Sequence, residues 1–366
     1  MAGKFLLKKF ADIDLEDSFF DSLKVDYPGN ENSTGFVEWF NKKANDGSTA
    51  LVFEDEVGVG AFVVLKDEHE KIEIQGGILP DIKRIKVSTF RIAERFRRQR
   101  IGEGAIGLVL WKWQQSDSEE IYVTVFDKHE TLIFQLERFG FKKVGKNPNG
   151  ENVLIKSRKN IDFSDPYKAF PFIKSSFDYA GYIIVDDNYH DTMFAYSELA
   201  NVTSLHSKIS SSVSNGLSKI YVGKASQVKY KVGEPVLIYR RYTQGTGKRF
   251  RSCITSYCVV TDIIQAKINN RFLMTFEELK RKISNKSVFD EDELFRQYNS
   301  FKYLTIIEML YYGYFGARNN VNLDWLDNNG CWSVEGQYPT DVRLTEKQFK
   351  RVLTEGNVNV SNVIID

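Results

Sequence analysis

The sequence predicts two successive units: an α/β unit built on a mixed sheet, then a β-rich, barrel-like unit edged by short helices. Its 366 residues are the length of about two domains. Strand and helix patterns alternate in the first part, whereas strand patterns dominate the second. The intervening segment, 160–172, holds two of the seven prolines. We therefore expect an α/β domain at 1–159, a linker at 160–172 and a β-rich domain at 173–366.

In the α/β unit, each element is predicted from the spacing of its apolar residues. Strand patterns alternate or are rich in β-branched residues, and they lie at 6–10, 48–55, 57–67, 72–75, 84–93, 119–127 and 153–159. Helical spacing occurs at 15–24, 35–44, 102–115 and 129–139. The two runs around Glu54–Glu56 form an antiparallel hairpin, and Gly140 ends the last helix.

In the second unit, strand patterns are long and helices are few. Strands are predicted at 180–187, 219–225, 234–242, 251–264 and 302–315. Helices are predicted at 275–284, 290–298 and 344–356. The last has Thr345 as N-cap, Gln348 three residues on as its capping-box partner, and Gly356 at its end.

The charge is balanced overall and uneven locally. Lysine plus arginine number 50 and aspartate plus glutamate 49, so the formal net charge of +1 excludes a protein coated with basic residues for general polyanion binding. Residues 1–81, however, carry 8 basic and 17 acidic side chains. Residues 82–100 then carry 8 basic side chains and only Glu94 as an acid. Positive charge is thus concentrated in one short segment.

The three cysteines do not form a disulfide framework or a CxxC motif, so we expect buried free thiols in a reducing compartment. No apolar run is long enough to span a bilayer. These features predict a cytoplasmic protein without a membrane partner. Consecutive acids at 186–191 are more typical of a turn than of a metal site, and no metal is predicted.

The basic segment ends in Arg97-Arg98-Gln99-Arg100-Ile101-Gly102-Glu103-Gly104, between a strand and a helix. Such a turn directs backbone N–H groups into one space, and the helix N-terminus adds its positive dipole end. Gly102 and Gly104 allow a ligand to approach the backbone. The segment is neither a P-loop nor the dinucleotide fingerprint. The alternative is a solvated basic turn without a ligand.

This arrangement resembles the GNAT N-acetyltransferase superfamily over residues 1–158. The acyl-CoA motif of that family stands at the same strand–helix junction, here as Gln99-Arg100-Ile101-Gly102, with Arg100 where a glycine is usual. A second family signature is matched by Gly140-Phe141, with His129 at its Asn position. Its tyrosine position holds Leu136, which cannot protonate a leaving thiolate.

The resemblance implies that acetyl-CoA is the acyl donor, with its pyrophosphate on the amides of Arg98 to Gly104 and its thioester carbonyl near Thr89–Ile92. An amine would attack directly in a ternary complex. The resemblance assigns these cofactor-binding residues: Phe90, Ile92, Arg97, Arg98, Gln99, Arg100, Ile101, Gly102, Glu103, Gly104 and His129.

Two side chains are candidates for catalytic proton transfer. Glu73 in the predicted strand 72–75 is a candidate general base, and Tyr122 is a candidate that faces the cleft. The alternatives carry more weight: an exposed strand glutamate and a half-buried β tyrosine.

The strongest feature of the second unit is a predicted basic hairpin at 239–251. Its candidate nucleic-acid-binding residues are Arg240, Arg241, Tyr242, Lys248, Arg249 and Arg251. The alternative is a solvated edge hairpin whose charges prevent aggregation. Residues 218–265 resemble PUA-like domains of the ASCH and EVE type, and this resemblance implies RNA recognition.

Together, these features predict an acetyl-CoA-dependent N-acetyltransferase whose acceptor is a tRNA or another RNA-associated amine. One alternative is a protein or small-amine acetyltransferase whose second unit is a scaffold. The other is a non-catalytic nucleic-acid-binding module that responds to acetyl-CoA.

Overall fold

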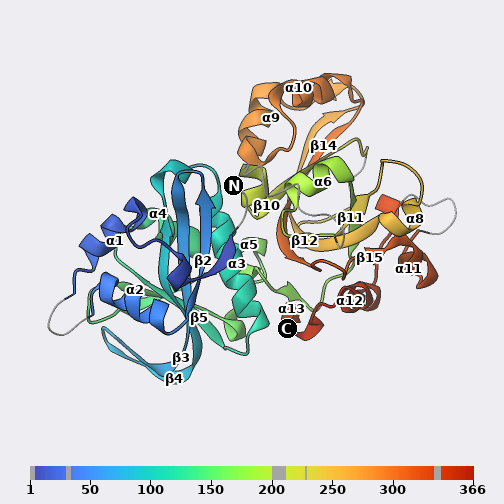
Figure 1. Ribbon diagram of the computed structural model, residues 1–366. Coiled ribbons are helices and arrows are strands. Elements are labelled where there is room, and N and C mark those ends of the chain that lie inside the picture. Colours follow the sequence, from blue (N-terminus) through green and yellow to red (C-terminus); the bar gives the residue numbers. More distant parts are fainter. Residues whose placement is uncertain (1–4, 30–33, 200–211, 227–228, 334–338) are drawn as a thin grey trace.

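The computed structural model describes residues 5–29, 34–199, 212–226, 229–333 and 339–366. Two large sheets lie side by side, with helix α3 (Ile101–Gln115) between them (Figure 1). The first sheet and its helices come from the N-terminal part of the chain, and the second from the C-terminal part. The predicted fold class is confirmed: a mixed α/β unit precedes a β-rich unit.

The first sheet has the strand order β1-β2-β3-β4-β5-β7-β6. Its strands are β1 (Leu6–Lys9), β2 (Thr49–Asp55), β3 (Gly58–Ile74), β4 (Gly77–Ile92), β5 (Glu120–Val125), β6 (Lys142–Lys146) and β7 (Asn152–Ser157). Only the β4–β5 pair is parallel, and α3 is its crossover helix. The site described below lies at this pair.

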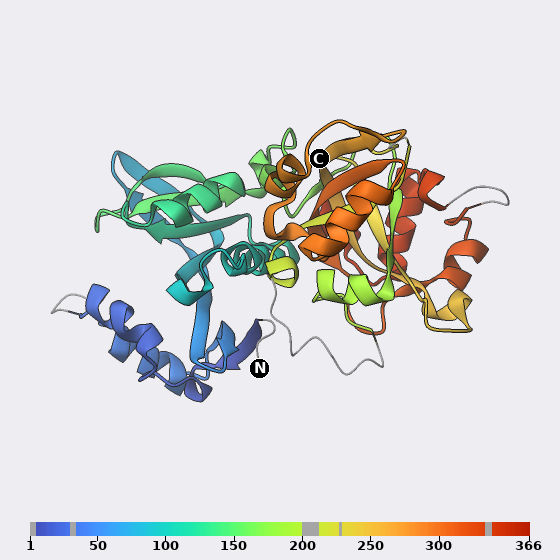
Figure 2. The ribbon, with the colours of Figure 1, turned by 90° about the horizontal axis from the view of Figure 1, so that it is seen from above.

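Helices cover both faces of the first sheet because β3 buries alternate residues on opposite sides. On one face, Phe62 joins phenylalanines from α2 (Phe36–Asn45) and from the two 3-10 turns before α1 (Asp21–Asp26). On the other face, Ala61 and Val63 pack in the cluster that includes α3. Figure 2 shows α1 and α2 at a distance from the second unit.

Two strand predictions differ from the structure. Segments 72–75 and 84–93 belong to one long hairpin, because β3 continues to Ile74 and turns at Gly76, which has a φ of 88°. Strand β6 was not predicted, because its five residues are largely exposed and polar and lack an alternating apolar pattern. Helix α4 (Glu130–Arg138) lies where it was predicted, and Gly140 follows it with a φ of 83°.

The second sheet has the order β10-β14-β12-β11-β9, with β13 and β15 paired to β12. Its strands are β9 (Gly181–Asp186), β10 (Ser218–Gly223), β11 (Pro235–Arg241), β12 (Cys253–Ile268), β13 (Arg271–Phe272), β14 (Leu304–Tyr314) and β15 (Val321–Asn322). Among the described residues, end strands β9 and β10 do not pair with each other, so the sheet is a half-barrel rather than a closed barrel.

Short helices edge this sheet, as predicted. They are α6 (Asp187–Met193), α7 (Ser212–Asn215), α8 (Lys248–Arg251), α9 (Phe276–Ile283), α10 (Glu291–Ser300), α11 (Leu323–Asn328), α12 (Glu346–Glu355) and α13 (Val360–Val363). The capping box of α12 is present, with Thr345 and Gln348 bonding each other's backbone amides. The three cysteines are buried and free.

The segment expected to be a linker is packed between the two units. It forms the short helix α5 (Pro166–Ala169), and both Phe170 and Phe172 are fully buried. Strand β8 (Ile173–Lys174) then pairs with β16 (Ile364–Ile365) at the end of the chain. One hydrophobic cluster runs from the first sheet through α3 and this segment to the second sheet. The two units therefore share a core.

Candidate functional site

Strands β4 and β5 separate at their carboxyl ends. Their pairing stops at Val87 and Val123, although β4 continues to Ile92 and β5 to Val125. The cause is a β-bulge: Thr89 lies opposite Val64 and Val87 opposite Leu65, so Ser88 is an extra residue that bends β4. Beyond the bulge, β4 still pairs with β3 but has no partner strand on the β5 side. We call the separation between these ends of β4 and β5 the gap. In open α/β sheets, ligands bind at the carboxyl ends of parallel strands.

Two cofactor-site candidates, Phe90 and Ile92, lie on this free part of β4 and are half-buried. The expected carbonyl-binding stretch Thr89–Ile92 therefore begins where the pairing with β5 has ended. Backbone N–H groups on such an unpaired edge are available to an oxygen ligand.

The turn from β4 into α3 directs unpaired amides into open space. Arg98 and Arg100 have left-handed backbones, with φ of 65° and 60°. Arg100 thus adopts the conformation that a glycine would adopt more easily at this position. In the described part of the chain, no acceptor meets the backbone N–H groups of Arg98, Arg100, Ile101, Gly102 or Glu103. A side chain at Gly102 would meet nothing within 4 Å, so this side of the turn is open.

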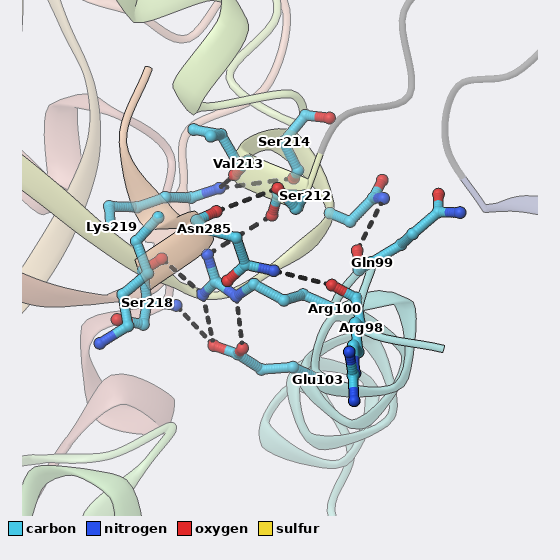
Figure 3. Close-up of polar contacts among 12 residues, drawn as sticks. Arg98, Gln99, Arg100, Glu103, Ser212, Val213, Ser214, Ser218, Lys219 and Asn285 are labelled. Carbon is cyan, nitrogen blue, oxygen red and sulfur yellow. Dashed lines mark hydrogen bonds and ion pairs between the residues drawn. The ribbon is translucent and has the colours of Figure 1, made fainter. Parts of the chain in front are cut away.

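The other side of the turn is closed by the second unit, which the Arg100 and Glu103 side chains and Gly104 face. A Cβ at Gly104 would lie 2.2 Å from the carbonyl oxygen of Asn215, so this glycine allows the two units to approach. Arg100 and Glu103 form a buried ion pair with Nε–Oε2 and Nη2–Oε1 distances of 2.9 and 3.0 Å. Their side chains point toward Ser218 of β10 in the second unit (Figure 3).

Contacts with Ser218 complete this buried pair. The Arg100 guanidinium donates to the Ser218 carbonyl at 2.6 Å, and the Ser218 amide donates to the Glu103 carboxylate at 2.7 Å. Burial by itself would raise the pKa of Glu103, but Arg100 and the Ser218 amide outweigh it and lower the pKa. The pair is therefore charged and is part of the interface.

The remaining cationic candidates are exposed. Arg97 forms an ion pair with Glu94 at 2.6 Å, and Arg98 extends from the turn without a side-chain partner in the described chain. His129 precedes α4, near the end of β5, and is exposed. Partial burial and then Lys128 lower the pKa of His129, which favours a neutral imidazole.

Neither predicted proton-transfer residue lies at the gap. Glu73 is exposed and pairs with Ile78 near the end of the hairpin, ten residues along β4 from Ser88 and thus about 30 Å away. Tyr122 is buried and lies opposite Lys86, where β4 and β5 are still paired. It donates a hydrogen bond to Glu68, and its burial and this carboxylate raise its pKa far above its usual range. These positions favour the structural alternatives for both residues.

The structure brings together residues that the sequence did not single out. Tyr27 follows α1, and burial, then Glu151 and Asp26, raise its pKa. Asp26 forms an ion pair with Lys128 at 2.9 Å, and Arg91 on the free part of β4 interacts with Asp26. Asp26 at the end of α1 is thus near Arg91 of β4, and Tyr27 is near Glu151, which precedes β7. The acidic excess of residues 1–81 is a sequence signal that bears on Asp26 but not on Glu151.

Most of the predicted nucleic-acid-binding cations are neutralised by carboxylates from other segments. Arg240 is buried and pairs with Asp191 at 2.8 and 2.9 Å, and Arg241 pairs with Asp186. Arg249 bonds Asp324 and Asp327, and Arg251 donates to the Tyr242 hydroxyl at 2.6 Å. Lys248 is exposed on α8. The predicted hairpin of β11 and β12 is present, and three of its arginines form ion pairs, of which only that of Arg240 is buried.

The acids at 186–191 have protein partners: Asp187 accepts from Thr243, and Asp186 and Asp191 pair with arginines. Within the described ranges, no group of three or more His, Cys, Asp or Glu side chains is arranged to hold a metal ion. None of the helices described is both long and apolar enough to cross a membrane.

Comparison with family models and with curated proteins found no match. Solved structures did match. A GNAT-family acetyltransferase from Listeria monocytogenes is 17% identical, with 42% of this chain and 94% of that chain covered and a TM-score of 0.30. Arabidopsis thaliana Naa50 in complex with a bisubstrate analogue is 17% identical, with 42% and 99% covered and a TM-score of 0.28.

The ASCH structure from Zymomonas mobilis is 10% identical, with 48% of this chain and 94% of that chain covered and a TM-score of 0.31. This chain is thus similar to structures of both kinds that its sequence resembles, a GNAT acetyltransferase and a PUA-like ASCH domain.

Proposed function

We propose that this protein transfers an acetyl group from acetyl-CoA to an amine at the gap between β4 and β5. The observation that carries the proposal is the juxtaposition of an unpaired strand edge with a turn of acceptor-free amides at the start of α3. The turn fits a pyrophosphate, because the amides, the helix dipole and Arg98 all favour negative charge there. The gap then accommodates the pantetheine arm, whose amides pair with strand edges.

In this reaction the amine nitrogen attacks the thioester carbon, the C–N bond forms, and the C–S bond breaks. Amides of β4 beyond the bulge stabilise the oxygen that becomes negative. The nitrogen loses its proton, and the CoA thiolate gains one. Leu136 is buried in the core, so the proton donor is another group or water. The main contribution of the protein is to position the two reactants.

The acceptor side favours a cationic amine. Glu151 places negative charge near Tyr27, and a carboxylate there attracts an ammonium group before it is deprotonated. Glu151 is mostly buried and accepts from the Asn147 side chain at 2.8 Å, so its carboxylate is held in place. We assign Glu151 as the general base that replaces Glu73 in this role.

For the second unit, the contacts favour a supporting role over RNA selection. It shares a core with the first unit, and the ion pairs of Arg240, Arg241 and Arg249 leave Lys248 and Arg251 as the basic groups for an RNA phosphate. The hypothesis of an RNA-linked acceptor is therefore supported only by the family resemblance and by these two side chains.

Calorimetry with acetyl-CoA tests the proposal, together with thiol release in the presence of amine pools. We expect Gly102→Glu to weaken binding at least about tenfold, because it places a carboxylate at the anion site. Gly102→Ala is the matched control, since its methyl group enters open space. No binding by the native protein, or equal binding by Gly102→Glu, would refute the proposal. Binding without thiol release for tRNA, peptide and polyamine pools would favour the non-catalytic alternative.

A further inference from the structure

We propose that Asn215 and Asn285 of the second unit are positioning residues that orient the phosphate-binding turn of the first unit. This inference rests on the proposed function and extends it, because it makes the acyl-donor site a product of both units. Neither residue faces the open side of the turn. Both donate hydrogen bonds to carbonyl groups of the turn, on the side opposite the open one.

The side-chain amides of the two asparagines donate hydrogen bonds to the two carbonyls in the middle of the turn. The Asn285 side-chain amide donates to the Arg98 carbonyl at 2.7 Å, and that of Asn215 donates to the Gln99 carbonyl at 3.0 Å. Figure 3 shows the Asn285 contact with Arg98, on the side of the turn that faces the second unit. The Ser212 hydroxyl also donates to the Asn285 carbonyl at 3.0 Å, which links the segments that carry the two asparagines.

A peptide unit is planar, and its C=O and N–H point in opposite directions. Holding the Gln99 carbonyl therefore directs the Arg100 N–H away from the second unit, toward the open side. Holding the Arg98 carbonyl likewise fixes the preceding peptide, whose Gln99 N–H bonds Phe96 at 3.1 Å. Left-handed backbones at two arginines are unfavourable without such support.

Arg100 anchors the same arrangement. A Cβ added to Gly216 would lie 2.1 Å from Cζ of the Arg100 guanidinium, so only glycine fits at position 216. The guanidinium also donates to the Ser212 carbonyl at 3.4 Å and the Ser218 carbonyl at 2.6 Å. An arginine at the usual glycine position is thus explained: it fixes the turn to the second unit.

The test compares two acyl donors. Acetyl-CoA carries the pyrophosphate, whereas S-acetylpantetheine has the same thioester without it. In the full-length protein, Asn215→Leu and Asn285→Leu keep similar side-chain volume and remove the donor. We expect each to raise the KM for acetyl-CoA about 3- to 10-fold, the effect of one hydrogen bond, with kcat and the S-acetylpantetheine kinetics unchanged. Asn285→Gln, which retains the donor, should recover part of the loss.

The matched control is Asn299→Leu, because Asn299 also donates from the second unit to a backbone carbonyl, that of Phe295 at 3.0 Å. Its KM should equal that of the native protein. Equal losses with both donors would mean general damage and would overturn the inference, as would unchanged kinetics with acetyl-CoA.

Inorganic pyrophosphate separates this inference from the proposed function. If the native protein does not use or bind acetyl-CoA, the proposed function fails. The inference still stands if pyrophosphate binds to the native protein and more weakly to both leucine variants. It is overturned if pyrophosphate does not bind, or binds all of them equally.

Discussion

At the scale of single residues, neighbours decide what each charge does. Arg100 and Arg240 carry charges that the sequence assigns to ligands, and the structure places both in buried ion pairs. Lys219 is a further case that the sequence does not reveal. Its ammonium is fully buried beside Arg100 and donates to the Val213 and Ser214 carbonyls. We expect these buried charged side chains to contribute to the free energy of unfolding rather than to ligand binding.

The pH dependence of stability tests this role of Lys219. Burial, and then Arg100, lower the pKa of Lys219 from 10.5 to about 7. Between these values the unfolded chain binds more protons than the native state, so stability from this group rises with pH, by up to about 1.4 kcal/mol per unit. We expect Lys219→Met to remove this contribution from urea unfolding measured at pH 7.5 to 9.5. Parallel pH profiles for the native protein and the variant would contradict it.

At the scale of elements, helix α3, which was predicted from its apolar spacing, is buried on almost all sides. The stripe at Ile106, Val109, Leu110 and Trp113 is present, but Trp111 and Gly107 on other sides are buried too. The Trp111 indole donates to the Tyr312 carbonyl at 2.6 Å. Helix α3 therefore has one face for the first sheet and another for the second unit.

Substitution of Gly104 tests this second face. Gly104→Val should lower the free energy of unfolding by about 2 kcal/mol, because its side chain collides with the Asn215 backbone. Gly102→Ala, two residues earlier, meets open space and should be neutral or slightly stabilising. Denaturant unfolding of both variants measures the difference. Equal stabilities would mean that the units do not pack at Gly104.

At the scale of the whole molecule, the two sheets depend on each other. Buried Lys156, near the end of strand β7, donates hydrogen bonds to the Phe139, Lys168 and Phe170 carbonyls. These bonds hold the connecting segment against the first unit. Phe170 in turn packs on Trp111 and on Tyr312 of β14. Separation would expose this aromatic cluster to water.

A fragment of residues 1–159 should consequently not unfold as a stable cooperative unit, because it would expose the second face of α3. Circular dichroism during urea titration would show a broad transition at lower urea concentration than in the full chain. A sharp transition at the full-length midpoint would show that the first unit is independent. The full-length protein is the reference at equal concentration.

The elements of the first unit were predictable because their apolar periodicity is local. The same holds for α12, whose capping residues lie within one turn of sequence. The turn at 97–104 was predictable too, since its glycines and arginines are contiguous. Strand β6 was missed because an exposed edge strand needs no apolar pattern, and Tyr27 and Glu151 because they come from loops far apart in sequence.

The sequence by itself therefore determined two units, the order of most elements and the position of the turn that we propose as the pyrophosphate site. Tertiary structure alone decided which side of that turn is open. It did so because Asn215, Asn285 and Gly216 come from segments more than a hundred residues away, and their contacts with Arg98, Gln99 and Arg100 exist only once both units have packed on α3. Arg240 pairs with Asp191 and Arg249 with Asp324, 49 and 75 residues away, so these pairings of the basic hairpin also depend on tertiary structure.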